Sequence, residues 1–420
     1  MTLARRECIL PPMSEVPESP PRPELVSFEL RNFRAFSHAR VELEPDITVL
    51  IGRNDVGKST LLEAISRYGS TLGEGSQGSD KTLWGIGPHA PFFAARWRLG
   101  SEIWEHSIRF DARDPEERLS TGEMWWRWDA LAHTLDSHAG EFKVNGLKSI
   151  IHLTTLSAKQ WLLNTNVPEA VFAPLGTAAS FAVAGPYLFE PSQLRKYNAF
   201  NATRPPELTG RGWPIWLQQV LNRRDGDFEA IETALRGMFP FFRGLRLQIR
   251  QPSAAENSAD AGPDAGLLRY NVSIEVGSEA GESDESPPRV LPVDAASSGL
   301  LLALAHLALA YADDDSRLFL LEEPENGLNA KITLDMMRSF LDAVRQRKRQ
   351  IILTTHNPWW LDLVPRESIR VLTRDKVGAH VHRPNVDELD ALLAEIDAHP
   401  SELMDVYGPE GLLMNRRPRQ

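Results

Sequence analysis

One nine-residue stretch near the N-terminus constrains the fold of this chain more than any other feature. Residues 52–60 read GRNDVGKST and satisfy the spacing G-x-x-x-x-G-K-[ST]. The apolar run Ile47–Ile51 precedes the motif, and Ser59–Tyr68 follows it with helical periodicity. A strand, a glycine-bounded loop and a helix in this order predict a phosphate-binding loop. A chance glycine turn before a surface helix is the alternative, which the flanking strand and helix disfavour.

The residue types of this motif suit the chemistry of phosphate. Phosphate groups concentrate negative charge, so backbone N–H groups must converge on them, and the glycines and the helix dipole allow this. We expect Lys58 to reach the β- and γ-phosphates and the Ser59 hydroxyl to ligate Mg²⁺. The candidate nucleotide site comprises Gly52, Arg53, Asn54, Asp55, Val56, Gly57, Lys58, Ser59 and Thr60.

A pair of carboxylates ends a second apolar run. Leu318–Leu321 reads as a buried strand, and Glu322 and Glu323 follow it directly. Acids after a central strand lie at the carboxyl edge of an open α/β sheet, where such sheets bind ligands. We expect Glu322 to hold Mg²⁺ and Glu323 to orient and polarise the attacking water. The alternative is an acidic run that only caps a helix beginning near Leu328.

A histidine follows the next apolar run, Ile351–Thr354. His356 can donate to a γ-phosphate and so distinguish ATP from ADP, although a lone histidine is more often structural. Its place one strand–helix unit after the carboxylates favours the functional interpretation. The segment Ala330–Arg347 between the two runs has a helical pattern. Apolar strands that alternate with helices predict a parallel sheet covered on both faces.

Composition bounds the rest of the chain. Its 420 residues, with 42% hydrophobic and 25% charged, predict a globular protein with more than one folding unit. The formal net charge of −11 gives no support for a strongly basic nucleic-acid binder and leaves the partner open. The most apolar stretch, Gly299–Ala310, is shorter than the ~20 residues that span a bilayer. The single cysteine, Cys8, fits a reducing compartment. A cytoplasmic protein without a membrane segment is therefore expected.

The three motifs, in this order and spacing, resemble the ABC-type ATPases of the OLD, RecF and SMC kind, especially the stand-alone bacterial ATPases of that group. Beside the phosphate-binding loop, the likeness is carried by NFRAF at 32–36, EEPENGLNAK at 322–331 and TTHNPWWLD at 354–362. Further similar stretches are PYLFEPSQLRKYN at 186–198, DFEAIETALRGMFPFFRGLRL at 227–247 and MDVYGPEGLL at 404–413. The resemblance implies an α/β fold, a P-loop NTPase of the ABC-ATPase type with an antiparallel β subdomain and a mainly helical middle insertion.

Five units are expected along the chain. A loose tail at 1–23 precedes a first ATPase lobe at 24–140, which holds the phosphate-binding loop and the β subdomain. A mainly helical insertion lobe with acidic loops follows at 141–290. The second ATPase lobe, at 291–384, holds the signature segment, the carboxylates and the histidine, and a helical tail ends the chain at 385–420.

The resemblance also implies a signature segment just before the helix that precedes the carboxylates. Here it falls on Ser297, Ser298 and Gly299, which would contact the γ-phosphate bound by another subunit. An ordinary helix N-cap at Ser297 or Ser298 is physically the same structure, and only a dimer can tell the two apart.

Other family positions are less well matched. The resemblance implies a Mg²⁺-sensing glutamine between the phosphate-binding loop and the signature, and both Gln160 and Gln193 are candidates. Asn329 stands where a histidine is common, and Asn357 where a serine usually follows the switch histidine. These departures bear on the contacts between subunits and on turnover rather than on ATP binding.

These implications lead to the hypothesis of an ATP-driven switch. Two subunits of a homodimer, or of a higher homo-oligomer, would sandwich ATP, and hydrolysis would release the closed state. Lys58, Glu323 and His356 would carry the catalysis. By resemblance the process is DNA-related, in anti-phage defence or repair, with a separate nuclease or toxin effector. The alternatives are an ABC transport cassette, which the long separation of Lys58 from Ser297 disfavours, and an ATP-binding scaffold that scarcely hydrolyses.

Overall fold

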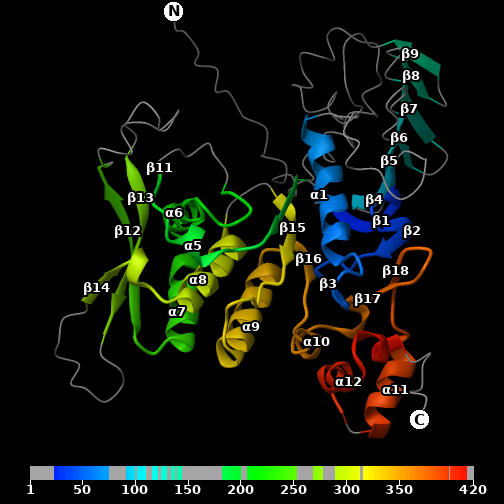
Figure 1. The fold of residues 1–420 in the computed structure, drawn as a ribbon. Coiled ribbons are helices and arrows are strands. Elements are labelled where there is room, and N and C mark those ends of the chain that lie inside the picture. The colour runs from blue at the N-terminus through cyan, green and yellow to red at the C-terminus, as the bar shows by residue number, and fades with distance from the viewer. Residues whose placement is uncertain are drawn as a thin grey trace, which may run out of the picture.

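Three sheets and the helices between them make up the described part of the chain (Figure 1). The computed structural model describes residues 23–74, 91–99, 102–109, 116–121, 124–129, 134–137, 140–143, 182–199, 206–251, 253, 268–277, 289–312, 316–396 and 398–413. Helices separate the central, mostly parallel sheet from the antiparallel sheets on either side of it, as Figure 1 shows.

The central sheet joins strands from distant parts of the sequence. Its order is β10 (Ala182–Tyr187), β15 (Ser316–Glu322), β16 (Gln350–Thr354), β3 (Ile47–Gly52), β17 (Ile369–Arg374) and β18 (Ala379–His382). The first five strands are parallel, and only β18 pairs antiparallel. Carboxyl ends of parallel strands share one edge, so Glu322 pairs with Thr354 while Gly52 pairs with Leu372. The motifs predicted from the sequence meet at this edge.

Helices cover both faces of the central sheet, as the sequence predicts. One face carries α1 (Lys58–Glu74), and the other carries α8 (Ser298–Tyr311) and α9 (Ala330–Gln346). Successive side chains of a strand point to opposite faces. Accordingly, Val49 joins the core under α8 and α9, whereas the next residue, Leu50, joins the core under α1. Burial on both faces explains why the central strands lack polar alternation.

An eight-stranded antiparallel sheet lies against the other side of α1 (Figure 1). Its strands, in sheet order, are β2 (Phe36–Glu42), β1 (Glu24–Phe33), β4 (Phe92–Leu99), β5 (Glu102–Arg109), β6 (Glu116–Thr121), β7 (Met124–Asp129), β8 (Thr134–Ser137) and β9 (Gly140–Lys143). Phe28 of β1 packs against Tyr68 of α1 and against Phe93 of β4 in a shared buried cluster. This sheet is the antiparallel β subdomain expected from the resemblance.

The described residues in the middle of the chain contain more strand than the mainly helical insertion predicted for 141–290. Its described helices are α5 (Pro191–Leu194), α6 (Pro214–Arg223) and α7 (Asp227–Met238). A third sheet contains β11 (Asn198–Ala199), β12 (Phe242–Arg250), β13 (Arg269–Val276) and β14 (Arg289–Pro292). Because β10 joins the central sheet and β14 continues past residue 290, the predicted units share sheets. Most of both predicted acidic loops, 251–266 and 275–288, lies outside the described residues.

The end of the described chain is helical. It contains α10 (Trp360–Leu363), α11 (Val386–Ile396), α12 (Pro400–Tyr407) and the short 3₁₀ helix η5 (Pro409–Leu413), while η3 (Val293–Ala295) and η4 (Arg366–Ser368) lie before α8 and β17. The predicted N-terminal tail, apart from Pro23, lies outside the described residues, as do residues 414–420. Within the described ranges, no helix has the length and apolarity needed to cross a membrane.

We expect His306 to make the stability of the folded protein depend on pH. The side chain is buried in α8, where Nδ1 donates to the Leu302 carbonyl at 2.8 Å and the ring packs on Phe189 and Phe340. Burial lowers the pKa of His306 from its ordinary 6.5 to about 4, against the opposing effect of the hydrogen bond. The unfolded chain therefore binds a proton that the folded chain excludes. We expect stability to be full above pH 6.5 and to fall by about 3 kcal/mol as the pH drops towards 4.

Urea unfolding of the His306→Phe variant between pH 7 and pH 4 tests this expectation. The variant should lose about 3 kcal/mol less over that range than the parent protein. Phe189→Leu is the matched control, since it thins the packing around the same imidazole and should lower stability at every pH. Identical pH profiles for parent and His306→Phe would show that other groups cause the acid sensitivity.

Candidate active site

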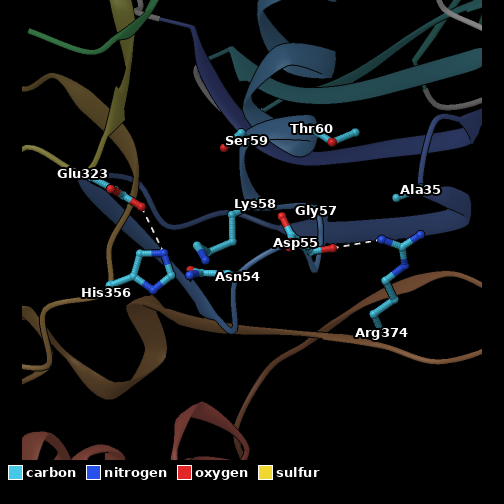
Figure 2. A pocket seen from close by; sticks show the side chains of 10 residues that line it. All are labelled: Ala35, Asn54, Asp55, Gly57, Lys58, Ser59, Thr60, Glu323, His356 and Arg374. Carbon is cyan, nitrogen blue, oxygen red and sulfur yellow. Dashed lines mark hydrogen bonds and ion pairs between the residues drawn. The ribbon is translucent and has the colours of Figure 1, made fainter.

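A pocket of about 380 Å³ opens at the carboxyl edge of the central sheet (Figure 2). Its described lining residues are Ala35, Asn54, Asp55, Gly57, Lys58, Ser59, Thr60, Glu323, His356 and Arg374. They come from the β1–β2 turn, the phosphate-binding loop, and the ends of β15, β16 and β17. The pocket therefore joins all three motifs that the sequence singled out.

The phosphate-binding loop has room only for glycine at its two ends. A Cβ on Gly57, which has φ of +111°, would lie 3.0 Å from the Phe36 ring. A Cβ on Gly52 would lie 2.7 Å from the Leu372 carbonyl oxygen. Val56 is buried beneath the loop, whereas residues 53–55 are exposed. The loop is thus held close to β17 and to the β1–β2 turn, with its polar residues outward.

Lys58 lies at the first residue of α1 and spans the inside of the loop. Its Nζ donates to the carbonyl oxygens of Gly52 at 2.8 Å and Arg53 at 3.1 Å. Burial lowers the pKa of Lys58, and the charges of Glu323, Glu322 and Asp55 oppose that shift. A buried ammonium at a helix N-terminus offers positive charge and N–H donors to a polyanion.

Ser59 and Glu322 form an oxygen pair between the loop and the central sheet. The Ser59 hydroxyl donates to Glu322 Oε1. Hydroxyl and carboxylate oxygens are ligands that Mg²⁺ prefers, and Mg²⁺ usually takes few ligands from protein and the rest from phosphate and water. Among the described residues, no group of three or more His, Cys, Asp or Glu side chains could hold a metal. Two protein oxygens beside a phosphate-binding loop therefore fit Mg²⁺.

Glu323 is held in one orientation by its backbone and by two side chains. It has φ of +44°, which is uncommon for a residue other than glycine, and its N–H donates to the Thr354 carbonyl at 2.9 Å. One carboxylate oxygen lies 3.0 Å from His356 Nε2, and the other accepts from Asn326 Nδ2 at 2.5 Å. Figure 2 shows the Glu323–His356 pair at one end of the pocket. A carboxylate fixed in this way can orient a water and accept its proton.

Glu325 connects the loop after β15, which carries Glu323, to the loop after β16, which carries His356 and is called the histidine loop below. The sequence alone did not predict this role. The side chain is buried, and Oε1 accepts from the Thr355 hydroxyl and from the His356 backbone N–H. Oε2 accepts from Trp360 Nε1 at 3.1 Å. The sequence offered one signal, since a carboxylate two residues after Glu323 stands between two predicted elements of the site.

The signature segment lies outside the pocket. Ser297 caps α8, and its Oγ accepts from the Leu300 N–H at 3.3 Å. Arg195, which follows α5, donates to the Ala296 carbonyl and to Ser298 Oγ, both at 3.0 Å. Within one chain, this segment therefore forms a helix N-terminus that Arg195 stabilises, as the N-cap alternative describes. Its residues are Ser297, Ser298 and Gly299. No local sequence pattern predicts the contacts of Arg195 with this segment.

The remaining family positions have local structural roles. Gln193 lies in α5 after β10, on the carboxyl side of the central sheet, and does not line the pocket, whereas Gln160 lies outside the described residues. Asn329 caps α9, with Oδ1 accepting from the Ile332 N–H at 3.0 Å. Asn357 Oδ1 accepts from the Trp359 N–H at 3.0 Å. Both asparagines stabilise turns next to the site.

Two sequence families match this chain, one at each half of the pocket. Residues 24–71 match "AAA ATPase domain", and residues 237–362 match "AAA domain, putative AbiEii toxin, Type IV TA system". A curated relative, the DNA replication and repair protein RecF of Arthrobacter sp. (strain FB24), is 35% identical over 78 residues. Two segments of the chain, which together hold the three motifs, are thus similar to AAA-family ATPase domains, and a shorter stretch is similar to RecF. The RecF match covers 19% of this chain and 19% of that relative, so the shared part is about a fifth of either length.

Solved structures of SMC heads are similar to this chain at low sequence identity. The SmcHead bound to the C-winged helix domain of ScpA covers 87% of this chain and 99% of its own, at 12% identity and a TM-score of 0.48. A second match is an Smc head domain with an extended coiled coil, bound to the C-terminal domain of ScpA and derived from Pyrococcus furiosus. It covers 90% of this chain and 100% of its own, at 13% identity and a TM-score of 0.46. The SMC head domain from Thermotoga maritima covers 86% of this chain and 100% of its own, at 13% identity and a TM-score of 0.40.

Proposed function

We propose that the protein binds ATP with Mg²⁺ in this pocket and hydrolyses it. The observation that carries the proposal is the convergence of Lys58, Ser59, Glu323 and His356 on one pocket, with Glu322 in contact with Ser59. An ammonium, a helix N-terminus and a pair of metal-type oxygens suit a nucleoside triphosphate. A fixed carboxylate at the far end suits attack by water on its terminal phosphate.

Each side chain has a separate task in this proposal. Lys58 exchanges the loop carbonyls for phosphate oxygens, and Ser59 and Glu322 hold Mg²⁺. The metal, when bound, supplies positive charge to the phosphate oxygens. Glu323 orients the attacking water and accepts its proton, while His356 donates to the γ-phosphate. The buried Glu325 keeps the histidine loop in register with the carboxylates.

Lys58→Ala is expected to raise the Kd for ATP with Mg²⁺ about 10- to 100-fold, because the variant loses charged hydrogen bonds of about 1.5–3 kcal/mol. Calorimetric titration measures this, and phosphate release measures the accompanying loss of turnover. Lys348→Ala is the matched control, since Lys348 is an exposed lysine just before the amino end of β16, away from the pocket. Equal affinity of parent and Lys58→Ala would contradict the proposed site.

We further propose that ATP closes a homodimer, or a higher homo-oligomer, of this protein in the cytoplasm. Ser297 is exposed at the start of α8 and lies outside the pocket of its own chain, which supports a contact with nucleotide on a second subunit. A helix N-terminus suits a γ-phosphate. In this proposal, binding of the γ-phosphate shifts the population towards the dimer, and hydrolysis reverses the shift.

The purpose of the cycle is proposed to be DNA-related, in anti-phage defence or repair, with a separate nuclease or toxin effector. The similarity to a DNA replication and repair protein and to a family described with a toxin–antitoxin system supports this assignment. The test is phosphate release by the parent protein with and without double-stranded DNA. Stimulation would support the DNA-related role, and turnover indifferent to DNA would direct the search to RNA or protein triggers.

A further inference from the structure

The pocket has two chemically different ends. Glu323 and His356 lie at one end, and Ala35 and Arg374 lie at the other, beyond Asp55 (Figure 2). If the terminal phosphate of a nucleotide points towards Glu323, as the proposed function requires, the nucleoside extends towards Arg374. The position of the nucleoside at this second end therefore rests on the proposed function.

Strand pairing fixes the position of Arg374. β17 runs parallel to β3, and Leu372 pairs with Gly52 at the start of the phosphate-binding loop. Arg374 lies two residues further along, at the carboxyl end of β17, and its guanidinium donates to the Asp55 carbonyl at 3.0 Å. The side chain is exposed towards the pocket while one nitrogen remains bound to the loop.

The turn after Arg374 is held rigidly against the rest of the wall. Asp375 Oδ1 accepts from the Val377 N–H at 2.7 Å and from the Gly378 N–H at 3.1 Å. The Ala379 N–H then donates to the Ala35 carbonyl at 2.9 Å, which joins this turn to the β1–β2 turn. Arg374 and Ala35 thus belong to one continuous wall.

Among the described residues that line the pocket there is no phenylalanine, tyrosine or tryptophan. Phe36 is the ring behind Gly57, but it is fully buried and cannot face a ligand. Within the described ranges, the planar group that a nucleobase can meet at this end is therefore the guanidinium of Arg374. Guanidinium groups stack on aromatic faces and gain from the charge of the cation.

We propose that Arg374 forms the nucleobase subsite of this pocket, where its guanidinium plane stacks on the base of the bound nucleotide. Its hydrogen bond to the Asp55 carbonyl holds the guanidinium beside the loop that binds the phosphates. The ligand class is a nucleoside triphosphate, and Arg374 adds affinity for the base without adding affinity for the phosphate chain.

Calorimetric titration of the full-length protein with ATP and with inorganic triphosphate, both with Mg²⁺, tests the subsite. Arg374→Ala should weaken ATP binding about 3- to 30-fold and leave triphosphate binding within about twofold. Arg374→Lys keeps the charge but loses the planar group, so it should resemble Arg374→Ala. Lys376→Ala is the control, because Lys376 is an exposed cation of the same turn that does not line the pocket.

The outcomes separate the subsite from the proposed function. An equal loss of ATP and triphosphate in Arg374→Ala would overturn the subsite, because Arg374 would then act on phosphate or only brace the loop. Stacking would also be overturned if Arg374→Ala bound both ligands as tightly as the parent protein, or if Arg374→Lys bound ATP with the parental affinity. Failure of the parent protein to bind ATP and triphosphate at all would instead overturn the proposed function, and the subsite with it.

Discussion

Replacement of Glu323 by glutamine is expected to lower ATP turnover about 10²- to 10⁴-fold while ATP binding is retained. Glutamine has nearly the same shape, so the contacts with His356 and Asn326 at the end of the pocket can largely persist. The amide cannot accept the proton of the attacking water, so the loss falls on the chemical step. Single-turnover phosphate release together with the Kd for ATP separates the two effects.

The same variant distinguishes a hydrolysing switch from a scaffold that scarcely turns over. A switch that cannot hydrolyse should accumulate as an ATP-bound dimer, which sedimentation or light scattering detects, whereas a scaffold should hardly change. Glu229→Gln, on the exposed face of α7, is the matched control for loss of a carboxylate. A parental rate of hydrolysis in Glu323→Gln would remove Glu323 from the proposed chemistry.

Glu325→Ala is expected to lower the free energy of unfolding by about 3–5 kcal/mol. Three donors converge on this buried carboxylate: the Thr355 hydroxyl, the His356 N–H and the Trp360 indole N–H. Each donor left unpaired in the interior costs about 1–3 kcal/mol, and partial rearrangement reduces the sum. Because His356 lies on the same loop, turnover should fall as well.

Urea unfolding of Glu325→Ala and Glu325→Gln measures this cost. Glutamine keeps one acceptor oxygen, so the free energy of unfolding of Glu325→Gln should lie between that of the parent protein and that of Glu325→Ala. Glu388→Ala, at an exposed position of α11, is the control and should change stability by less than about 0.5 kcal/mol. A loss below about 1 kcal/mol in Glu325→Ala would mean that water or other groups replace the carboxylate.

The elements that the sequence predicted well are those with strong local signals. The phosphate-binding loop, the buried runs at 47–51, 318–321 and 351–354 and the helix at 227–238 all appear where the residue patterns place them. Continuous apolar strands and helical periodicity are properties of short windows, so they are readable without the rest of the chain. The same windows located Lys58, Ser59, Glu322, Glu323 and His356, which the structure brings together at one edge.

In the middle of the chain, local sequence patterns do not suffice to predict which strands form and how they pair. β12 and β13 form a long antiparallel pair across more than fifteen residues of sequence, and β10 joins a sheet whose other strands lie far away. Half-exposed strands such as β12, with Arg246 and Gln248 outward, carry weak patterns because only one face is apolar. Pairing across such distances is decided by tertiary contacts, so a mainly helical insertion was a natural but incomplete expectation.

The sequence by itself determined the chemistry of the site, because glycines, a lysine, a serine and paired carboxylates at fixed spacing can each be read from one segment. Only the tertiary structure decided the partners of those groups. Glu325 beneath the histidine loop, Arg195 against the signature and Arg374 beside the phosphate-binding loop are contacts between segments separated by 31, 101 and 319 positions. Hydrogen bonds and close packing depend on distances of a few ångströms in space, and no local pattern encodes them.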